Sequence, residues 1–232
     1  MAQPPDTSDT FLREVDENLR RDQVHDWFKD NGNLLIGAVV LFLVISGALI
    51  WYQQHKRDLA QQHVEQLAQV YRDIGTGNTA KVPQQLNDLS DASSKGVRAT
   101  ALFTRAAYAI QQNNQKAAIS TYQQIAGDSS FPDAYRNAAL IRQTALEFDT
   151  LQPQQVIARL EPLTKPGEPW FGSAGEMTAL ALIKQGKGAQ AGQLFVKLAN
   201  DKSVPESIRS RAIQIAGSLG ADASAAAGQP GQ

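Results

Sequence analysis

One uncharged segment near the N-terminus constrains this chain more than any other feature. Residues 34–52, LLIGAVVLFLVISGALIWY, carry no charge, and twelve of the nineteen are Leu, Ile, Val or Phe. As an α-helix the segment would be about 28 Å long, close to the roughly 30 Å hydrocarbon thickness of a bilayer. Insertion of those twelve side chains would gain at most about 4–7 kcal/mol. The segment is therefore predicted to be a transmembrane helix.

Aromatic residues flank this segment where membrane-interface anchors are expected. Trp27 and Phe28 precede it, and Trp51 and Tyr52 close it. A buried helix of a soluble protein is a weaker interpretation, because Ser46 is the one polar residue before the closing Tyr52. A cleaved signal peptide is also disfavoured, because the preceding stretch is long and acidic and the apolar run exceeds the usual 7–15 residues.

Charge around the span predicts its orientation. The basic residues before it are Arg13, Arg20, Arg21 and Lys29, and those close behind it are Lys56 and Arg57. The positive-inside rule then favours a cytoplasmic N-terminus, in a bacterial inner membrane, with the residues after the span in the periplasm. Residues 1–33 form a cytoplasmic arm with a short amphipathic helix that Asn31-Gly32 should stop. That helix lies on the membrane surface or, as the less favoured alternative, binds a partner.

The chain after the span predicts a juxtamembrane and connecting helix over 53–96 and then an internal repeat. Seven residues from Ala101 to Leu146 recur as the same type 73 positions later, and a weaker copy lies between them at offsets of 38 and 35. Such periods are typical of helix-turn-helix repeats. The expected pairs are 97–112 with 115–126, 133–148 with 153–161, and 172–185 with 189–200, closed by 206–218.

The predicted fold is therefore all-α, with a single transmembrane helix followed by a tetratricopeptide-like solenoid over 97–219. The first helices of such arrays line a protein-binding groove, and Thr100, Phe103 and Gln111 are predicted to face it. Chance similarity between Ala-rich helices is the alternative, but aligned Pro and aromatic positions argue against it. Residues 220–232 are small, low in complexity and predicted to be disordered.

Composition excludes several functional classes. The formal net charge of −1 argues against nucleic-acid binding, and the absence of cysteine excludes disulfides and thiol chemistry. His55 and His63 lie two helical turns apart, too far to share one metal ion. Glu147 and Asp149 have no evident partner for proton transfer, and no phosphate-binding or nucleophile motif occurs. We therefore predict no enzyme, no catalytic or metal-binding residue and no cofactor.

The order of these parts resembles one known family. An acidic arm ending in WFKDNG, a single span, WYQQHK, a long helix and tetratricopeptide-like pairs resemble the YfgM-type ancillary subunits of the bacterial Sec translocon. The resemblance implies a periplasmic domain that works beside SecYEG and a membrane-anchored chaperone, assisting exported unfolded proteins. A longer arm and the tail after Leu219 depart from the family. A structural scaffold of an envelope assembly or division complex is the alternative function.

Overall fold

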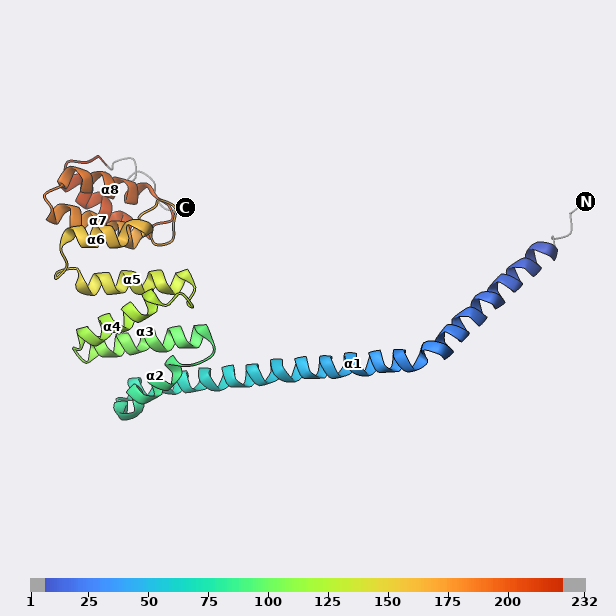
Figure 1. The fold of residues 1–232 in the computed structure, drawn as a ribbon. Coiled ribbons are helices and arrows are strands. Elements are labelled where there is room, and N and C mark those ends of the chain that lie inside the picture. The colour runs from blue at the N-terminus through green and yellow to red at the C-terminus, as the bar shows by residue number, and fades with distance from the viewer. Residues whose placement is uncertain (1–6, 223–232) are drawn as a thin grey trace, which may run out of the picture. The chain divides into compact units, whose positions relative to one another are not determined.

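The fold is helical throughout the described chain. The computed structural model describes the backbone of residues 7–222 and the side chains of residues 33–34 and 36–222. All regular elements in these residues are helices, which confirms the predicted all-α class (Figure 1). The chain forms two compact units, Met1–Gln61 and Gln62–Gln232, and each is described by itself.

The first helix, α1, runs from Thr7 to Thr76 without interruption. The stop predicted at Asn31-Gly32 is therefore wrong, although α1 bends in its blue, N-terminal part (Figure 1). A glycine inside a helix costs only about 1 kcal/mol and an asparagine less, whereas a break would forfeit the hydrogen bonds of a whole turn. The side chains of Trp27 and Phe28 lie outside the described residues, as do residues 223–232 of the tail 220–232 that is predicted to be disordered. Residues 220–222 of that tail are described and form an ordered turn after the last helix.

The apolar part of α1 is uncovered. The stretch Ile36–Thr76 is long and apolar enough to cross a membrane, and 0% of its most apolar window is buried. Large side chains such as Leu34, Phe42 and Ile50 are more than 60% exposed. Exposed apolar surface of this extent requires a nonaqueous environment or a partner. Within the described residues, the structure therefore contains one helix that is long and apolar enough to cross a bilayer, as the sequence predicts.

The second unit contains the helix pairs. After Thr76 a left-handed Gly77 turns the chain into a 3₁₀ turn, η1 (Thr79–Lys81). The remaining helices are α2 (Val82–Ser90), α3 (Lys95–Gln111), α4 (Gln115–Gly127), α5 (Asp133–Glu147), α6 (Pro153–Leu160) with the 3₁₀ turn η2 (Glu161–Leu163), α7 (Phe171–Lys184), α8 (Gly188–Asn200) and α9 (Glu206–Ser218). The bounds predicted from α3 onward agree within two residues. The unit also includes α2 and the end of α1.

Every helix of this unit shares its core with its neighbours along the chain. Four apolar clusters form between the end of α1, α2 and α3, between α3, α4 and α5, between α5, α6 and α7, and between α7, α8 and α9. Tyr122, Leu160 and Phe195 stand at equivalent repeat positions and are at most 3% exposed. They fill the space between the packed helices. The consecutive stacking is visible in Figure 1.

Small residues let these helices approach closely. Ala106, Ala118 and Ala191 are completely buried. A Cβ atom added at Gly175 of α7 would lie 2.9 Å from Cδ2 of Leu198 in α8, closer than real Cβ contacts allow. The alanines that recur along the sequence are therefore packing positions at which larger side chains would separate the helices.

The closing helix α9 presents one apolar and one polar side. Ala212 and Ala216 are buried in the last cluster, whereas Ser207, Ser210 and Gln214 are exposed. Gly220, with φ of +74°, ends the helix in a left-handed turn, and the N–H of Ala221 donates to the carbonyl of Ala216. This pattern is a Schellman ending. It returns the chain to α8, where Ala221 lies against Gly192.

The same turn precedes α5 and α9, which begin 73 residues apart in the sequence. Residues 128–133, DSSFPD, and 201–206, DKSVPE, each begin with an aspartate whose Oδ1 accepts the N–H of the serine two positions on, at 2.8 Å in both turns. The following apolar residue is buried, and the proline caps the next helix. Asp201 also accepts the N–H of Gly167 at 2.7 Å, which fastens the loop before α7.

Stability should depend on pH through Asp201. The hydroxyl of Ser203 lowers the pKa of Asp201 below its ordinary value of 3.8, aided by the N–H groups of Ser203 and Gly167 and partly opposed by burial. Because the folded pKa is depressed, the stabilisation is fully present above the unfolded value, about 3.9, and is lost as pH falls through the folded pKa. We expect Asp201→Asn to lower the unfolding free energy at pH 7 and the difference to shrink below about pH 5.

The measurement is chemical denaturation followed by circular dichroism at several pH values. Glu161→Gln, at an exposed position of η2, serves as the control and should show little difference at any pH. A deficit of Asp201→Asn that stays constant from pH 7 to pH 2 would contradict the assignment.

Candidate protein-binding surface

Side chains link the first helix of each pair to the first helix of the next pair. These first helices are α1, α3, α5 and α7, and the closing helix α9 follows them. Between α1 and α3, the hydroxyls of Tyr71 and Thr104 are hydrogen-bonded at 2.9 Å. Between α3 and α5, the guanidinium of Arg142 lies 5.0 Å from the centre of the Phe103 ring. Such a cation–π contact is worth about 0.5–1 kcal/mol when exposed. These contacts place the same side of successive first helices next to one another.

The linkage continues through the C-terminal half of the array. Lys184 of α7 contacts Asp149, just after α5, at 2.9 Å and also lies over the Phe148 ring. Arg211 of α9 binds Glu176 of α7 through two bonds of 2.8 and 2.9 Å. Hydrogen bonding to Glu176 raises the pKa of Arg211 above its ordinary value, so the guanidinium of Arg211 stays protonated.

Three apolar residues stand one helical turn from these linking residues. They are Ala107, Ala145 and Leu180, which follow Phe103, Arg142 and Glu176 respectively. The two alanines are exposed, whereas the leucine is half-buried and packs against the last apolar cluster.

The structure places the residues predicted for the groove as follows. Phe103 is half-buried beneath Arg142, with its ring 5.9 Å from that of Tyr122, and Gln111 is exposed two turns further along the same side of α3. Thr100 is half-buried, and its hydroxyl donates to the carbonyl of Gly96 at 2.8 Å. The helical spacing therefore puts Phe103 and Gln111 on the side that carries Ala107, whereas the hydroxyl of Thr100 is used within its own helix. Their role in binding stays a prediction.

The membrane-interface residues Trp51 and Tyr52 are 68% and 52% exposed. The Trp51 ring stacks on that of His55 at 5.7 Å, and Nζ of Lys56 lies 4.5 Å from the centre of the Tyr52 ring. Aromatic rings paired with polar groups one turn further on are suited to the boundary between lipid and water. Their anchoring role stays a prediction.

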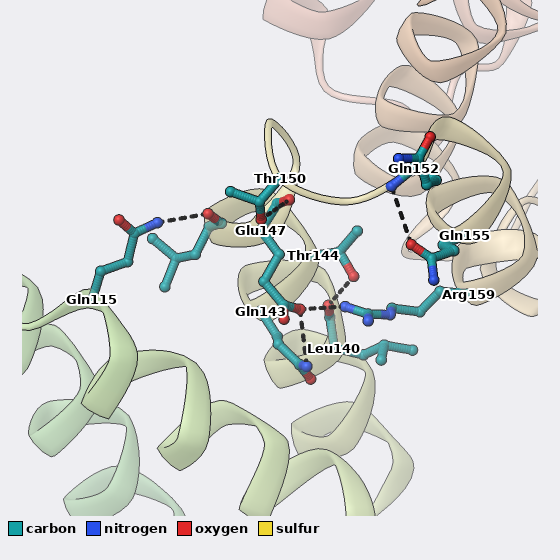
Figure 2. Close-up of polar contacts among 10 residues, drawn as sticks. Gln115, Leu140, Gln143, Thr144, Glu147, Thr150, Gln152, Gln155 and Arg159 are labelled. Carbon is teal, nitrogen blue, oxygen red and sulfur yellow. Dashed lines mark hydrogen bonds and ion pairs between the residues drawn. The ribbon is translucent and has the colours of Figure 1, made fainter. Parts of the chain in front are cut away.

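A polar cluster joins α5 to α6 where these helices meet (Figure 2). The carboxylate of Glu147 forms an ion pair with Arg159 of α6 and accepts a bond of 3.0 Å from Gln143. From the other side, Nε2 of Gln115 donates to the carbonyl of Leu146 at 2.6 Å. The Glu147 and Arg159 side chains are only 20% and 25% exposed. Glu147 and Asp149, which looked unpartnered in the sequence, are thus members of ion pairs between helices.

Other titratable groups also serve packing. The pKa of Arg105 is lowered by burial, partly offset by the nearby Asp91, and its guanidinium donates to Gln124 of α4 at 2.8 Å. Arg98 lies over the Phe131 ring and contacts Asp128 at 3.4 Å. Within the described residues, no group of three or more His, Cys, Asp or Glu side chains could hold a metal ion.

Helix pairs stacked in series, with first helices linked along one side, define a helical-repeat protein whose class usually binds other proteins. The family model of the tetratricopeptide repeat-like domain matches residues 25–216. The chain therefore belongs to the tetratricopeptide repeat-like domain family, and its repeat unit is a protein-interaction module. No curated protein and no solved structure matches the chain significantly.

Sequence reasoning missed the side-chain links between first helices. Two of them, Asp149 with Lys184 and Glu176 with Arg211, join opposite charges 35 positions apart, which equals one repeat period. A search for opposite charges at the repeat spacing could have found both. No comparable pattern marks Phe103 with Arg142, because many other pairs of large side chains could meet between those positions.

The Glu147–Arg159 pair should couple α5 to α6 energetically. A double-mutant cycle of Glu147→Gln and Arg159→Gln should give a coupling free energy of about 1 kcal/mol, since the pair is largely withdrawn from solvent. The same cycle on the exposed i,i+3 pair Asp133–Arg136 serves as the control and should give about 0.3 kcal/mol. Denaturant unfolding of the four proteins in each cycle measures both values. Equal coupling in the two cycles would show that the partly buried pair does not fasten the junction.

Proposed function

We propose that this protein is a non-enzymatic, membrane-anchored interaction module of the bacterial inner membrane, acting as an ancillary subunit of the SecYEG translocon. The observation that carries the proposal is one chain that joins an uncovered apolar helix to a tetratricopeptide repeat-like domain. The order of its parts resembles the YfgM-type subunits. Its partners are then the translocon, a membrane-anchored periplasmic chaperone and exported unfolded proteins.

The proposed topology is single-pass, with the N-terminus in the cytoplasm and the repeat domain in the periplasm. The excess of Arg and Lys before the span supports this orientation. The exposed Trp51 and Tyr52 would then lie at the periplasmic boundary of the bilayer.

The proposed mechanism is avidity. An anchor confines the repeat domain to the membrane surface, so its concentration near the translocon exit far exceeds that of a free periplasmic protein. Weak contacts with emerging chains or with a chaperone then suffice, because each dissociation is followed by rapid rebinding. Such a module needs a polypeptide-binding surface and an anchor but no catalytic group.

Topology can be tested directly because the chain contains no cysteine. We expect a membrane-impermeant maleimide to label the Ser210→Cys variant, at an exposed position of α9, in intact spheroplasts. The Ser8→Cys variant should be labelled only after the membrane is permeabilised. Labelling in the reverse pattern would invert the proposed topology, and labelling of neither variant after permeabilisation would show that the reagent cannot reach them.

The partners can be tested by purifying the tagged full-length protein from membranes in mild detergent and identifying associated proteins by mass spectrometry. A control bait keeps the span but lacks residues 97–219. We expect Sec subunits with the full-length bait, and chaperone or exported proteins only when the repeats are present. Sec subunits with both baits would assign translocon docking to the anchor region.

Failure to recover Sec subunits with either bait would contradict the translocon role. Recovery instead of one fixed envelope-assembly or division complex would favour the scaffold function.

A further inference from the structure

We propose that the turn of α1 just after the apolar segment binds the phosphate of an anionic phospholipid, with Lys56 and Arg57 as the contacting cations. This inference rests on one part of the proposed function, namely that residues 34–52 cross a bilayer. It adds a lipid partner and a preference for negatively charged headgroups, neither of which the repeat domain or the translocon role requires.

The two cations lie at the depth of the lipid headgroups. The apolar segment ends in the exposed rings of Trp51 and Tyr52, which are suited to the edge of the hydrocarbon layer. At about 1.5 Å per residue, Lys56 and Arg57 stand about 6 and 7.5 Å further along the helix than Tyr52. A bilayer is about 30 Å thick without its headgroups and about 40–45 Å thick with them, so each headgroup layer measures about 5–7 Å. Both residues are therefore level with this layer.

The side chains in this turn point back toward the bilayer. In an α-helix each Cα–Cβ bond is tilted toward the N-terminus, which is the side on which the apolar segment lies. Nζ of Lys56 lies 4.5 Å from the centre of the Tyr52 ring, one turn nearer that segment. The ring of His55 likewise stacks on the ring of Trp51 at 5.7 Å. The Lys56 ammonium is thus held close to the aromatic boundary instead of extending away from the membrane.

Neither cation is neutralised by the part of the chain that the structure describes. Lys56 and Arg57 are exposed and form no ion pair there, whereas Lys184 and Arg211 of the repeat unit are each bonded to an acidic residue. The residues three and four positions away from each cation, on either side, are uncharged. Asp58 is the next residue along the chain, but adjacent residues on a helix do not face each other. Both charges are therefore available to an external anion.

The arrangement of the two charges favours a lipid with a net negative headgroup. Lys56 and Arg57 are neighbours in the sequence, so they differ by about 100° around the helix and by about 1.5 Å in depth, and a single headgroup can reach both. Cations bind phosphate oxygens through charge-assisted hydrogen bonds. The phosphate of phosphatidylcholine is already neutralised by its own choline group, whereas that of phosphatidylglycerol is not. Two cations at one level should therefore select phosphatidylglycerol.

The test is native mass spectrometry of the full-length protein, released from detergent micelles that contain equal amounts of phosphatidylglycerol and phosphatidylcholine. The ratio of the two lipids retained on the protein measures its preference for the anionic headgroup. We expect phosphatidylglycerol to be enriched by about tenfold or more, because each cation near a charged membrane surface contributes about fivefold to affinity. The double variant Lys56→Gln/Arg57→Gln should bring the ratio close to one.

Two further variants separate charge from other effects. Lys56→Arg/Arg57→Lys keeps both charges and should keep the preference. Lys116→Gln/Lys197→Gln is the matched control, since it removes two exposed cations from α4 and α8, and it should also keep the preference. Helix content by circular dichroism and the amount of phosphatidylcholine retained should be equal in all variants, which shows that each one is folded and still binds lipid.

Three results would overturn the inference. The first is an unaltered protein without preference for phosphatidylglycerol, and the second is equal preference in Lys56→Gln/Arg57→Gln and Lys116→Gln/Lys197→Gln. The third is displacement of the lipid by millimolar glycerol phosphate, which would indicate a site for a soluble phosphate. The outcome is separable from that of the proposed function. Recovery of Sec subunits without a lipid preference would refute the lipid site alone, and a lipid preference without Sec subunits would refute the translocon role alone.

Discussion

The repeat unit depends on burial between helices that are close neighbours in the sequence. Each of the four apolar clusters draws on three consecutive elements, and small residues at their contacts let the helices come close enough to exclude water. No helix could bury its apolar side alone, so each is stabilised by the one before and the one after. Exposed residues of the first helices, such as Ala107 and Ala145, lie outside these clusters.

The sequence predicted the parts of the fold that short-range packing dictates. Alanines and the large residues Tyr122, Leu160 and Phe195 must recur at fixed spacing, because every helix pair makes the same contacts, and the helix bounds followed from them. The stop at Asn31-Gly32 was predicted wrongly because local preference was weighed without the long helix on either side. Local signals of about 1 kcal/mol do not decide a boundary within so long a run of hydrogen bonds.

The surface was less predictable than the core. Links such as Phe103 with Arg142 depend on how far long side chains reach between helices, and many pairs of residue types would satisfy the same geometry. The middle copy is the weakest in sequence, and its second helix is short and ends in a 3₁₀ turn. There the partly buried pair of Glu147 and Arg159 joins α5 to α6. Where the repeat pattern weakens, a specific polar contact holds the junction.

The two-sided character of α9 determines how this architecture can change in size. Its apolar side packs against α7 and α8, and its serine- and glutamine-bearing side is exposed. Because the copies repeat every 73 residues as two helix pairs, tandem duplication of that interval would insert before α9 and leave both ends of the array as they are. The number of helix pairs in the array could therefore grow in whole repeats, without any change to α1 or to α9.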